Sequence, residues 1–176
     1  MVALVVLSGL PAAGKTTFAA AFATRFGAAV LESDRVRREL FPERRYTSAE
    51  NARVFAEIRE RAAARLCEGG TVVIDATNVS RRDRSGFERL AQEHGARYVT
   101  VRLTTPESLL RERLAAPRSG ASEAGVAVYE RMRDRCEPFS TPCVHVDSRY
   151  DLDPSLALVD ALSRGTGAQT APVQPA

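Results

Sequence analysis

The segment Gly9-Leu-Pro-Ala-Ala-Gly-Lys-Thr16 matches the pattern G-x-x-x-x-G-K-[ST] in full. An apolar run of strand length, Val2–Leu7, precedes it, and Phe18, Phe22 and Phe26 recur after it at helical spacing. A strand, a glycine-containing loop and a helix in this order direct backbone N–H groups and the helix N-terminus at one point. The sequence therefore predicts a phosphate-binding loop between the first strand and the first helix.

Lys15 is the only lysine among 25 basic residues, and all the others are arginine. A lysine ammonium reaches nucleotide phosphates as a compact point charge, whereas an arginine guanidinium is a wide planar fork. We therefore predict that Lys15 is a catalytic residue that holds the β- and γ-phosphates of ATP. The residues that we expect to bind this nucleotide in the loop are Gly9, Ala12, Ala13, Gly14, Lys15, Thr16 and Thr17.

The length of 176 residues suits one compact domain, which we place at residues 1–164. The remaining stretch, 165–176, has the composition of a flexible C-terminal tail. Strand-like runs at 28–31, 71–75, 97–103 and 144–146 alternate with helical segments at 48–67, 80–94 and 105–115 and with a last helix opened by Asp153 and Pro154. This alternation predicts an α/β fold, a three-layer sandwich in which a five-stranded parallel sheet has helices on both faces.

The bulk composition limits the partners and the location that we expect. A net charge of +3 permits acidic substrates such as phosphates or a nucleic-acid 5′ end, but the basic and aromatic alternation of dedicated nucleic-acid binders is absent. Three cysteines without C-x-x-C spacing argue against a zinc site and favour the cytoplasm. The first apolar run is too short to span a membrane. We expect neither a membrane association nor an obligate protein partner.

Asp34 follows the second predicted strand, and parallel sheets bind ligands beyond the carboxyl ends of their strands. There it could take a proton from an attacking hydroxyl, and Arg37, one turn later, could bind a substrate phosphate or the transferred group. We predict a catalytic role for both residues. The alternative for Asp34, or for Ser33 beside it, is a helix N-cap, and an Asp34 carboxylate held still by capping could also be catalytic.

Asp75 ends the third predicted strand after the apolar residues Val72, Val73 and Ile74, which is the Walker B position of a phosphate-loop protein. We predict that Asp75 and Thr16 hold Mg²⁺. Thr77 and Asn78 follow, and they either orient a substrate or form a turn before the next helix. The sequence has no Asn-Lys-x-Asp segment and no Asp-x-x-Gly switch after this strand, which argues against a GTPase.

Residues 117–124 are small, polar and without periodicity, and arginines lie on both sides of them. We predict that this segment is a lid that closes over the triphosphate, with an ordinary surface loop as the alternative. Arg113 and Arg118 are the arginines that we expect to neutralise the nucleotide phosphates, Arg113 in binding and Arg118 in catalysis.

The motifs around the phosphate loop, Ser33–Arg37, Val73–Asn78 with Arg81 and Arg82, and the arginine-rich stretch 111–138 together resemble one group of small bacterial P-loop kinases. The group contains the phage-type polynucleotide 5′-kinase domain, zeta toxins and chloramphenicol phosphotransferase, and the similarity spans about residues 3–162. It implies a P-loop NTPase fold like that of nucleoside-monophosphate kinases. It also implies that Asp34 is the general base and that Arg37 contacts the acceptor.

The sequence thus predicts an ATP- and Mg²⁺-dependent phosphotransferase that acts on a hydroxyl. The acceptor is either a polynucleotide 5′-hydroxyl or a small molecule, because Arg35 and Val36 replace the second acid or aromatic residue that polynucleotide kinases tend to carry. The alternative is a nucleotide-dependent regulatory or binding module with slow ATPase activity. Asp34 discriminates between the two, because a switch needs no base beyond the second strand.

Overall fold

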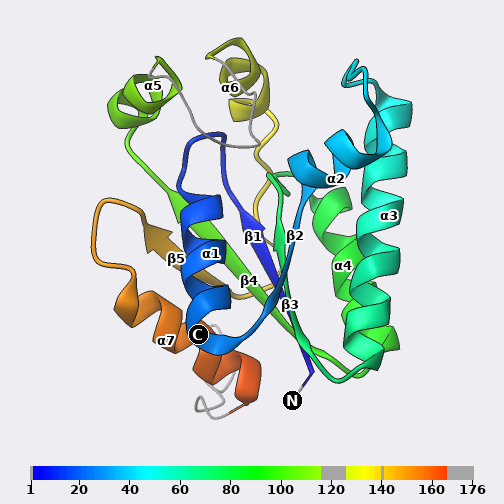
Figure 1. Cartoon of the computed structure of the whole chain (residues 1–176). Coiled ribbons are helices and arrows are strands. Elements are labelled where there is room, and N and C mark those ends of the chain that lie inside the picture. The colour runs from blue at the N-terminus through cyan, green and yellow to red at the C-terminus, as the bar shows by residue number, and fades with distance from the viewer. Residues whose placement is uncertain (1, 116–125, 140, 166–176) are drawn as a thin grey trace, which may run out of the picture.

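The computed structural model describes residues 2–115, 126–139 and 141–165. A five-stranded sheet in the order β2-β3-β1-β4-β5 forms its centre, and every neighbouring pair of strands is parallel (Figure 1). The strands are β1 (Ala3–Ser8), β2 (Ala29–Glu32), β3 (Thr71–Asp75), β4 (Arg97–Thr104) and β5 (Cys143–Asp147). The predicted parallel sheet is confirmed.

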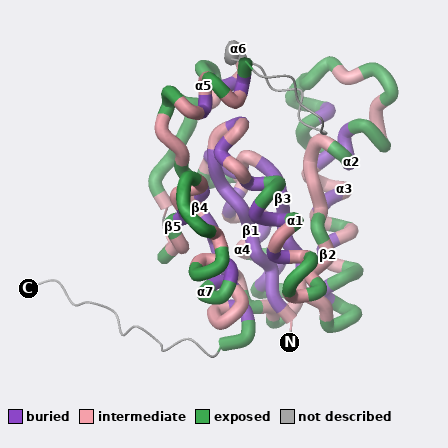
Figure 2. The backbone as a smooth tube through the Cα atoms, turned by 60° about the vertical axis from the view of Figure 1, so that its left-hand side comes forward, coloured by how far each residue is buried: buried purple, intermediate pink, exposed green. Residues whose placement is uncertain are grey.

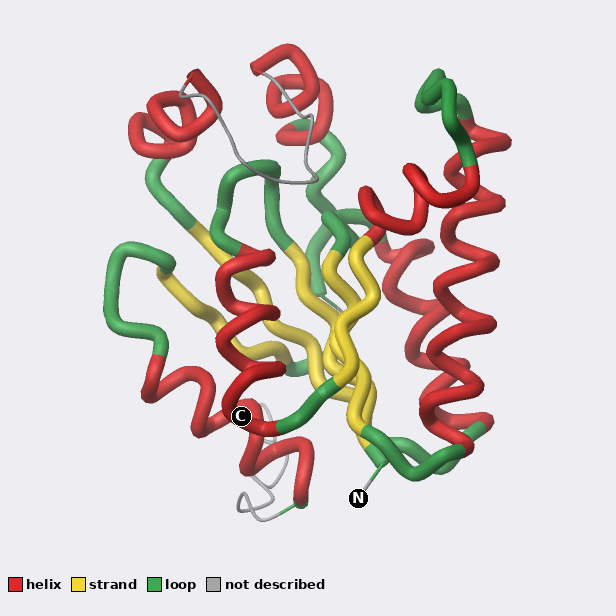
Figure 3. Tube along the Cα trace, viewed as in Figure 1, coloured by secondary structure: helices red, strands yellow, loops and turns green. Residues whose placement is uncertain are grey.

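Long helices cover both faces of this sheet, as Figure 3 shows in red on either side of the yellow strands. One face carries α1 (Lys15–Phe26) and α7 (Asp153–Arg164), and the other carries α3 (Ser48–Cys67) and α4 (Arg81–Glu93). The predicted three-layer α/β sandwich is therefore confirmed. Each of the described helices is too short or too polar to cross a membrane.

β1 is buried along its whole length, which explains its unbroken apolar sequence (Figure 2). Val5 and Leu7 pack with α1 and α7, whereas Leu4 and Val6 pack with α3 and α4. Alternate side chains of one strand thus belong to two separate hydrophobic cores. The phosphate loop leaves the sheet from this central strand.

Three shorter helices lie at the carboxyl edge of the sheet, at the top of Figure 1: α2 (Ser33–Leu40), α5 (Glu107–Ala115) and α6 (Val126–Arg133). α6 has no counterpart among the predicted elements, because its sequence was interpreted as part of an arginine-rich flank. The predicted lid 117–124 with Arg118 lies outside the described residues, and so does the tail beyond residue 165.

The predicted start of the last helix is wrong in one detail. The N-cap position of α7 is Leu152, and Asp153 is the first helical residue. The Asp151 carboxylate accepts a hydrogen bond from the Asp153 backbone N–H at 3.0 Å, so the local turn is stabilised by an acid two residues earlier. Proline near the helix start is confirmed.

Two glycine substitutions test how closely the loop packs on the sheet. Gly9 has φ +155°, and a Cβ there would lie 2.7 Å from the Leu103 carbonyl oxygen, so Gly9→Ala should destabilise the fold by about 1–3 kcal/mol. A Cβ on Gly86, inside α4, would meet only the Arg59 side chain at an ordinary contact distance of 3.9 Å, so Gly86→Ala should stabilise by about 0.5–1 kcal/mol. Denaturant unfolding measures both. Equal effects of the two substitutions would contradict the close packing of Gly9.

Candidate nucleotide and acceptor site

The phosphate loop adopts backbone conformations that few residue types accept. Gly14 has φ +92° and ends the loop as the N-cap residue of α1, and Ala12 has φ +66°. A Cβ on Gly14 would lie 3.1 Å from the Cβ of Ser148, so Ser148 closes the outside of the loop. The first turn of α1 contains no acidic residue and no capping side chain, so its amides suit an anion.

Lys15 lies across this loop and is only 9% exposed. Its Nζ donates to the Leu10 carbonyl at 2.9 Å, and the Ala13 N–H donates to the same oxygen at 3.2 Å. When a nucleotide binds, the ammonium of Lys15 could donate to a phosphate oxygen in place of the Leu10 carbonyl oxygen. The predicted role of Lys15 therefore has suitable geometry.

Asp75 and Thr16 meet beneath the loop. The Thr16 hydroxyl is hydrogen-bonded to the Asp75 carboxylate. Burial raises the pKa of Asp75, and the charge of Lys15 and the Thr16 hydrogen bond partly oppose this effect. The Asp75 carboxylate oxygen Oδ2 is buried and has no hydrogen-bond partner by the usual distance and angle criteria. A hard cation such as Mg²⁺ fits this pair, because an unpartnered carboxylate oxygen and a hydroxyl are ligands that it prefers.

A second acid, Glu32, lies beside Asp75 in the register of β2 and β3. Burial raises the pKa of Glu32 most, and the charges of Asp75 and Asp34 raise it further. Three carboxylates therefore share the carboxyl edge of these two strands. The sequence analysis missed Glu32, although the signal that identified Asp75, an acid that ends a strand, is present at Glu32 as well.

Asp34 is in the first turn of α2, within electrostatic range of Asp75 and Glu32. The cap position of α2 is Glu32, whose side chain makes no capping hydrogen bond. The expectation that Ser33 or Asp34 is the N-cap residue is therefore wrong, because both are already helical. An acid in a first helical turn is favoured by the helix dipole and can still face the cleft.

Arg37 is buried, with 4% of its surface exposed. Its Nη2 donates to Asn51 Oδ1 at 2.5 Å, its Nη1 lies 3.8 Å from Glu50 Oε2, and its guanidinium lies 4.9 Å from the centre of the Tyr46 ring. Nε and Nη1 have no hydrogen-bond partner. Buried donors without partners point to a ligand or water that would complete them.

Glu50 organises the surroundings of Arg37, and the sequence analysis did not identify it. Its carboxylate accepts from the backbone N–H groups of Arg45 at 3.0 Å and of Tyr46 at 2.6 Å. Tyr46 has φ +53°, an uncommon conformation for a residue with a side chain. Thr47, the N-cap residue of α3, accepts from the Glu50 N–H at 3.2 Å. Together these contacts fix the loop between α2 and α3.

Arg113 supports the phosphate loop from α5. Its Nη1 donates to the Ala12 carbonyl at 3.2 Å and to Ser148 Oγ at 3.0 Å. Thr105 Oγ1 donates to the Ala13 carbonyl at 3.4 Å and lies 2.6 Å from Ser148 Oγ. Ser148 follows β5, so its place beyond a strand end was the signal by which the sequence could have identified it.

Asn78 supports the loop from the other side and is completely buried. Its Nδ2 donates to the Leu7 carbonyl at 2.7 Å, and its own carbonyl accepts from Ser8 Oγ at 3.1 Å. The carbonyl of Thr77 accepts from the Gly9 N–H at 3.0 Å. Thr77 and Asn78 were expected either to orient a substrate or to form a turn. These contacts favour the turn, which supports the phosphate loop.

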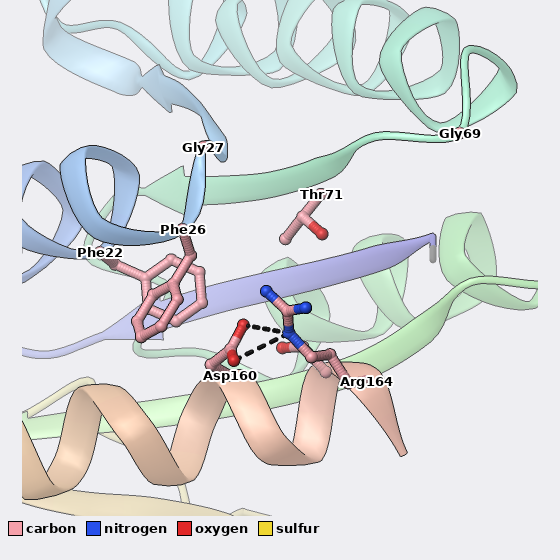
Figure 4. Close-up of a pocket in the computed structure, with 8 residues that line it drawn as sticks. Phe22, Phe26, Gly27, Gly69, Thr71, Asp160 and Arg164 are labelled. Atoms are coloured by element: carbon pink, nitrogen blue, oxygen red, sulfur yellow. Dashed lines mark hydrogen bonds and ion pairs between the residues drawn. The ribbon is translucent and has the colours of Figure 1, made fainter. Parts of the chain in front are cut away.

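Two of the hollows on the described part of the surface differ in chemistry. One, of about 230 Å³, lies at the amino edge of the sheet, between the ends of α1 and α7 (Figure 4). Its cation, Arg164, is already paired with Asp160 at 2.8 Å. The other, of about 220 Å³, lies beside Gly9 and Leu10 at the carboxyl edge. The second is lined by the phosphate-loop residues Gly9, Leu10 and Ala13, but its lining does not include Glu32, Asp34 or Asp75. We therefore place the candidate site at the phosphate loop and these acids, on the carboxyl edge of the sheet.

Asp75→Asn tests the electrostatics of this site. Because the folded pKa of Asp75 lies above 3.8, this carboxyl favours folding in acid and loses that contribution as the pH rises from 3.8 through the folded pKa. The variant should therefore raise the Tm of the Mg²⁺-free protein at neutral pH, with a smaller difference in acid. Calorimetry measures this, with the exposed Asp134→Asn as control. A lower Tm at neutral pH would mean that attraction to Lys15 outweighs the burial cost.

Comparison with known proteins agrees with the fold. The chain matches an uncharacterized protein of Mycobacterium tuberculosis at 26% identity over 152 residues, covering 80% of this chain and 30% of that protein, so it spans about a third of that relative's length. A gluconokinase from Sinorhizobium meliloti has a similar structure (TM-score 0.69, 21% identity, 96% and 98% of the two chains covered). So does Kti12 of Chaetomium thermophilum, solved with ADP-AlF3 (TM-score 0.70, 16% identity, 96% and 100% covered).

The same fold occurs in the APS kinase CysC of Mycobacterium tuberculosis, solved with AMPPNP and APS (TM-score 0.68, 18% identity, 91% and 96% covered). The predicted fold of a small P-loop kinase is therefore confirmed. A family model described as an AAA domain matches residues 4–139, which include the phosphate loop, Asp34, Asp75 and Arg113. The chain belongs to this AAA domain family and has the fold of the small P-loop kinases.

Proposed function

We propose that this protein transfers the γ-phosphate of ATP to a hydroxyl group of an acceptor. One observation carries this proposal: Asp34 lies within electrostatic range of Asp75, to which Thr16 of the phosphate loop is hydrogen-bonded. A nucleotide switch needs the loop, Thr16 and Asp75, but it does not need a carboxylate across the cleft. A phosphotransferase needs such a group to accept the proton of the attacking hydroxyl.

The residues divide the work as follows. Lys15 and the loop amides hold the β- and γ-phosphates, and Thr16 and Asp75 would hold Mg²⁺, which neutralises phosphate charge. Asp34 takes the proton of the acceptor hydroxyl, and the hydroxyl oxygen attacks the γ-phosphorus while the bond from that phosphorus to the β–γ bridging oxygen breaks and ADP leaves. Arg113, and Arg118 in the segment outside the described residues, would stabilise the transferred group. We place the activity in the cytoplasm, because the structure leaves all three cysteines unpaired.

Arg37 would bind the acceptor. Its buried Nε and Nη1 have no hydrogen-bond partner, and the Glu50 oxygens beside them already accept from two backbone N–H groups. Asp34 and Arg37 lie one helical turn apart on α2. An acceptor that carries a phosphate or carboxylate at a matching distance from its hydroxyl would satisfy these donors. Gluconokinase and APS kinase, whose fold this chain shares, are named for acceptors of different chemistry. A screen of γ-labelled ATP against oligonucleotides, nucleosides, sugars, sugar acids and aminoglycosides would identify the acceptor.

The phosphate-loop assignment is tested by Lys15→Ala. It should abolish ATP turnover without unfolding the protein, because Lys15 contacts the loop and not the cores. Lys15→Arg should be nearly as damaging, since a guanidinium is too wide for the loop. Arg25→Ala on the same helix removes a surface ion pair with Asp153 and a contact with the Phe26 ring, both away from the loop, and serves as the control. Near-normal turnover of Lys15→Ala would refute the assignment.

The general-base assignment is tested by Asp34→Asn. Loss of a base should slow transfer by about 10²–10⁴-fold. ATP affinity should change little, because Asp34 acts on the acceptor. Transfer is measured with labelled ATP and the best acceptor of the screen, and affinity by calorimetry. If transfer stays at the wild-type rate while ATP binds and hydrolyses slowly, the regulatory module with slow ATPase activity becomes the better interpretation.

A further inference from the structure

Arg84 of α4 is a buried cation that is held by carbonyl groups. Only 6% of its surface is exposed, and none of the ion pairs found among the described residues includes it. Nη1 donates to the carbonyls of Asn78 at 3.1 Å and Val79 at 2.8 Å. Nη2 donates to those of Glu137 at 3.2 Å and Pro138 at 2.7 Å. One guanidinium therefore joins two chain segments that lie more than 50 residues apart.

The first of these segments is the turn after β3, which supports the phosphate loop. Asn78 donates to the Leu7 carbonyl, and Thr77 accepts from the Gly9 N–H, so the turn is bonded to both sides of the β1 terminus. A displacement of this turn would reach the loop directly, because the Gly9 N–H is bonded to the Thr77 carbonyl. Arg84 holds the turn by its two outward carbonyls.

The second segment is the base of an arm, which we define as α6 with residues 134–139. Beyond the two bonds from Arg84, the Glu137 N–H donates to the Val79 carbonyl at 3.0 Å, and the Glu137 carboxylate accepts from the Arg81 N–H. The Phe139 ring lies 4.2 Å from the Arg84 guanidinium. The arm carries Arg131 and Arg133 on its helix, at the same edge of the sheet as the phosphate loop (Figure 1).

These contacts are costly to build for packing alone. A buried cation loses its hydration, and an apolar residue of similar volume often stabilises a core as well or better. Lysine has a single nitrogen and could not bridge two pairs of carbonyls in one plane. The planar five-donor guanidinium of Arg84 therefore suits one role, which is to hold the backbone segments 78–79 and 137–138 in a fixed position relative to each other.

We infer that Arg84 is a positioning residue that couples the arm to the phosphate loop. Through Arg84, the arginines of the arm keep a fixed position relative to the loop that holds the phosphates. This inference rests on the proposed function, because this position matters only if the arm meets the transferred group. Arg84 itself touches no reacting atom. Its loss should reduce the turnover rate more than the affinity for ATP.

The test compares Arg84→Met and Arg84→Lys with two controls on the same helix. Arg89→Met changes an exposed arginine, and Phe87→Leu weakens the core without touching residues 137–139. Hydrogen exchange of the nucleotide-free proteins should accelerate together at 76–79 and 134–139 in both Arg84 variants, and in neither control. MgATP turnover of Arg84→Met should fall by about 10–100-fold, with less than about a threefold change in KM for ATP. Arg84→Lys should be intermediate.

Two results would overturn the inference. The first is acceleration of exchange in only one of the two segments, since coupling requires both to loosen. The second is turnover in Arg84→Met equal to that of Phe87→Leu when both are measured well below their Tm, because the effect would then be loss of stability alone. If the wild-type protein binds and turns over no MgATP, the proposed function fails, and the exchange experiment alone decides whether Arg84 couples the segments.

Discussion

The phosphate loop depends on hydrogen bonds to its outward-facing carbonyl groups. A loop whose N–H groups converge on an anion must direct its carbonyls away from it, and these need donors. Here the side chains of three residues donate to the backbone carbonyls: Lys15 to that of Leu10, Arg113 to that of Ala12, and Thr105 to that of Ala13. The donors come from α1, α5 and the end of β4. The shape of the loop is therefore determined by elements that are distant in sequence, and the sheet order β3-β1-β4 brings them together.

The acids at the carboxyl edge oppose this stabilisation. Burial raises the pKa of Asp75 and Glu32 most, the charge of Asp34 raises both further, and the charge of Asp75 adds to the effect on Glu32. A protein selected for stability alone would not gather carboxylates in this way. The negative charge of these carboxylates would bind a divalent cation or a basic group on the acceptor side. For this reason the three acids support a catalytic interpretation more strongly than the loop by itself.

The architecture was readily predicted because its signals are local. The apolar run at β1, the loop motif and the Phe18 periodicity each concern fewer than about a dozen neighbouring residues, the range over which pattern is informative. α6 was missed because its short amphipathic pattern merges with an arginine-rich flank. Asp34 and Asp75 were identified by their place after strands, and Glu32 shares that place but was overlooked.

Other parts of the site could not be read from the sequence. The pairing of Arg37 with Glu50 and Asn51, and the bonds of Arg84 to the Glu137 and Pro138 carbonyls, depend on contacts between distant elements. An arginine in a chain with so many arginines gives no sign of which one is buried. Only the packing of α2 on α3, and of α4 under residues 137–139, distinguishes these two from the solvated majority.

The division of β1 between two hydrophobic cores has an evolutionary consequence. Val36, which seats α2, belongs to the core shared with α3 and α4, whereas Leu110 and Tyr129, which seat α5 and α6, belong to the core shared with α1 and α7. The half that would select an acceptor and the half that holds the nucleotide thus rest on opposite sides of one rigid strand. Apart from the Arg84 bonds that join α4 to residues 137 and 138, mutations in the apolar residues of one core need little compensation in the other. Descendants of such a chain could therefore change the acceptor half while they keep the nucleotide half.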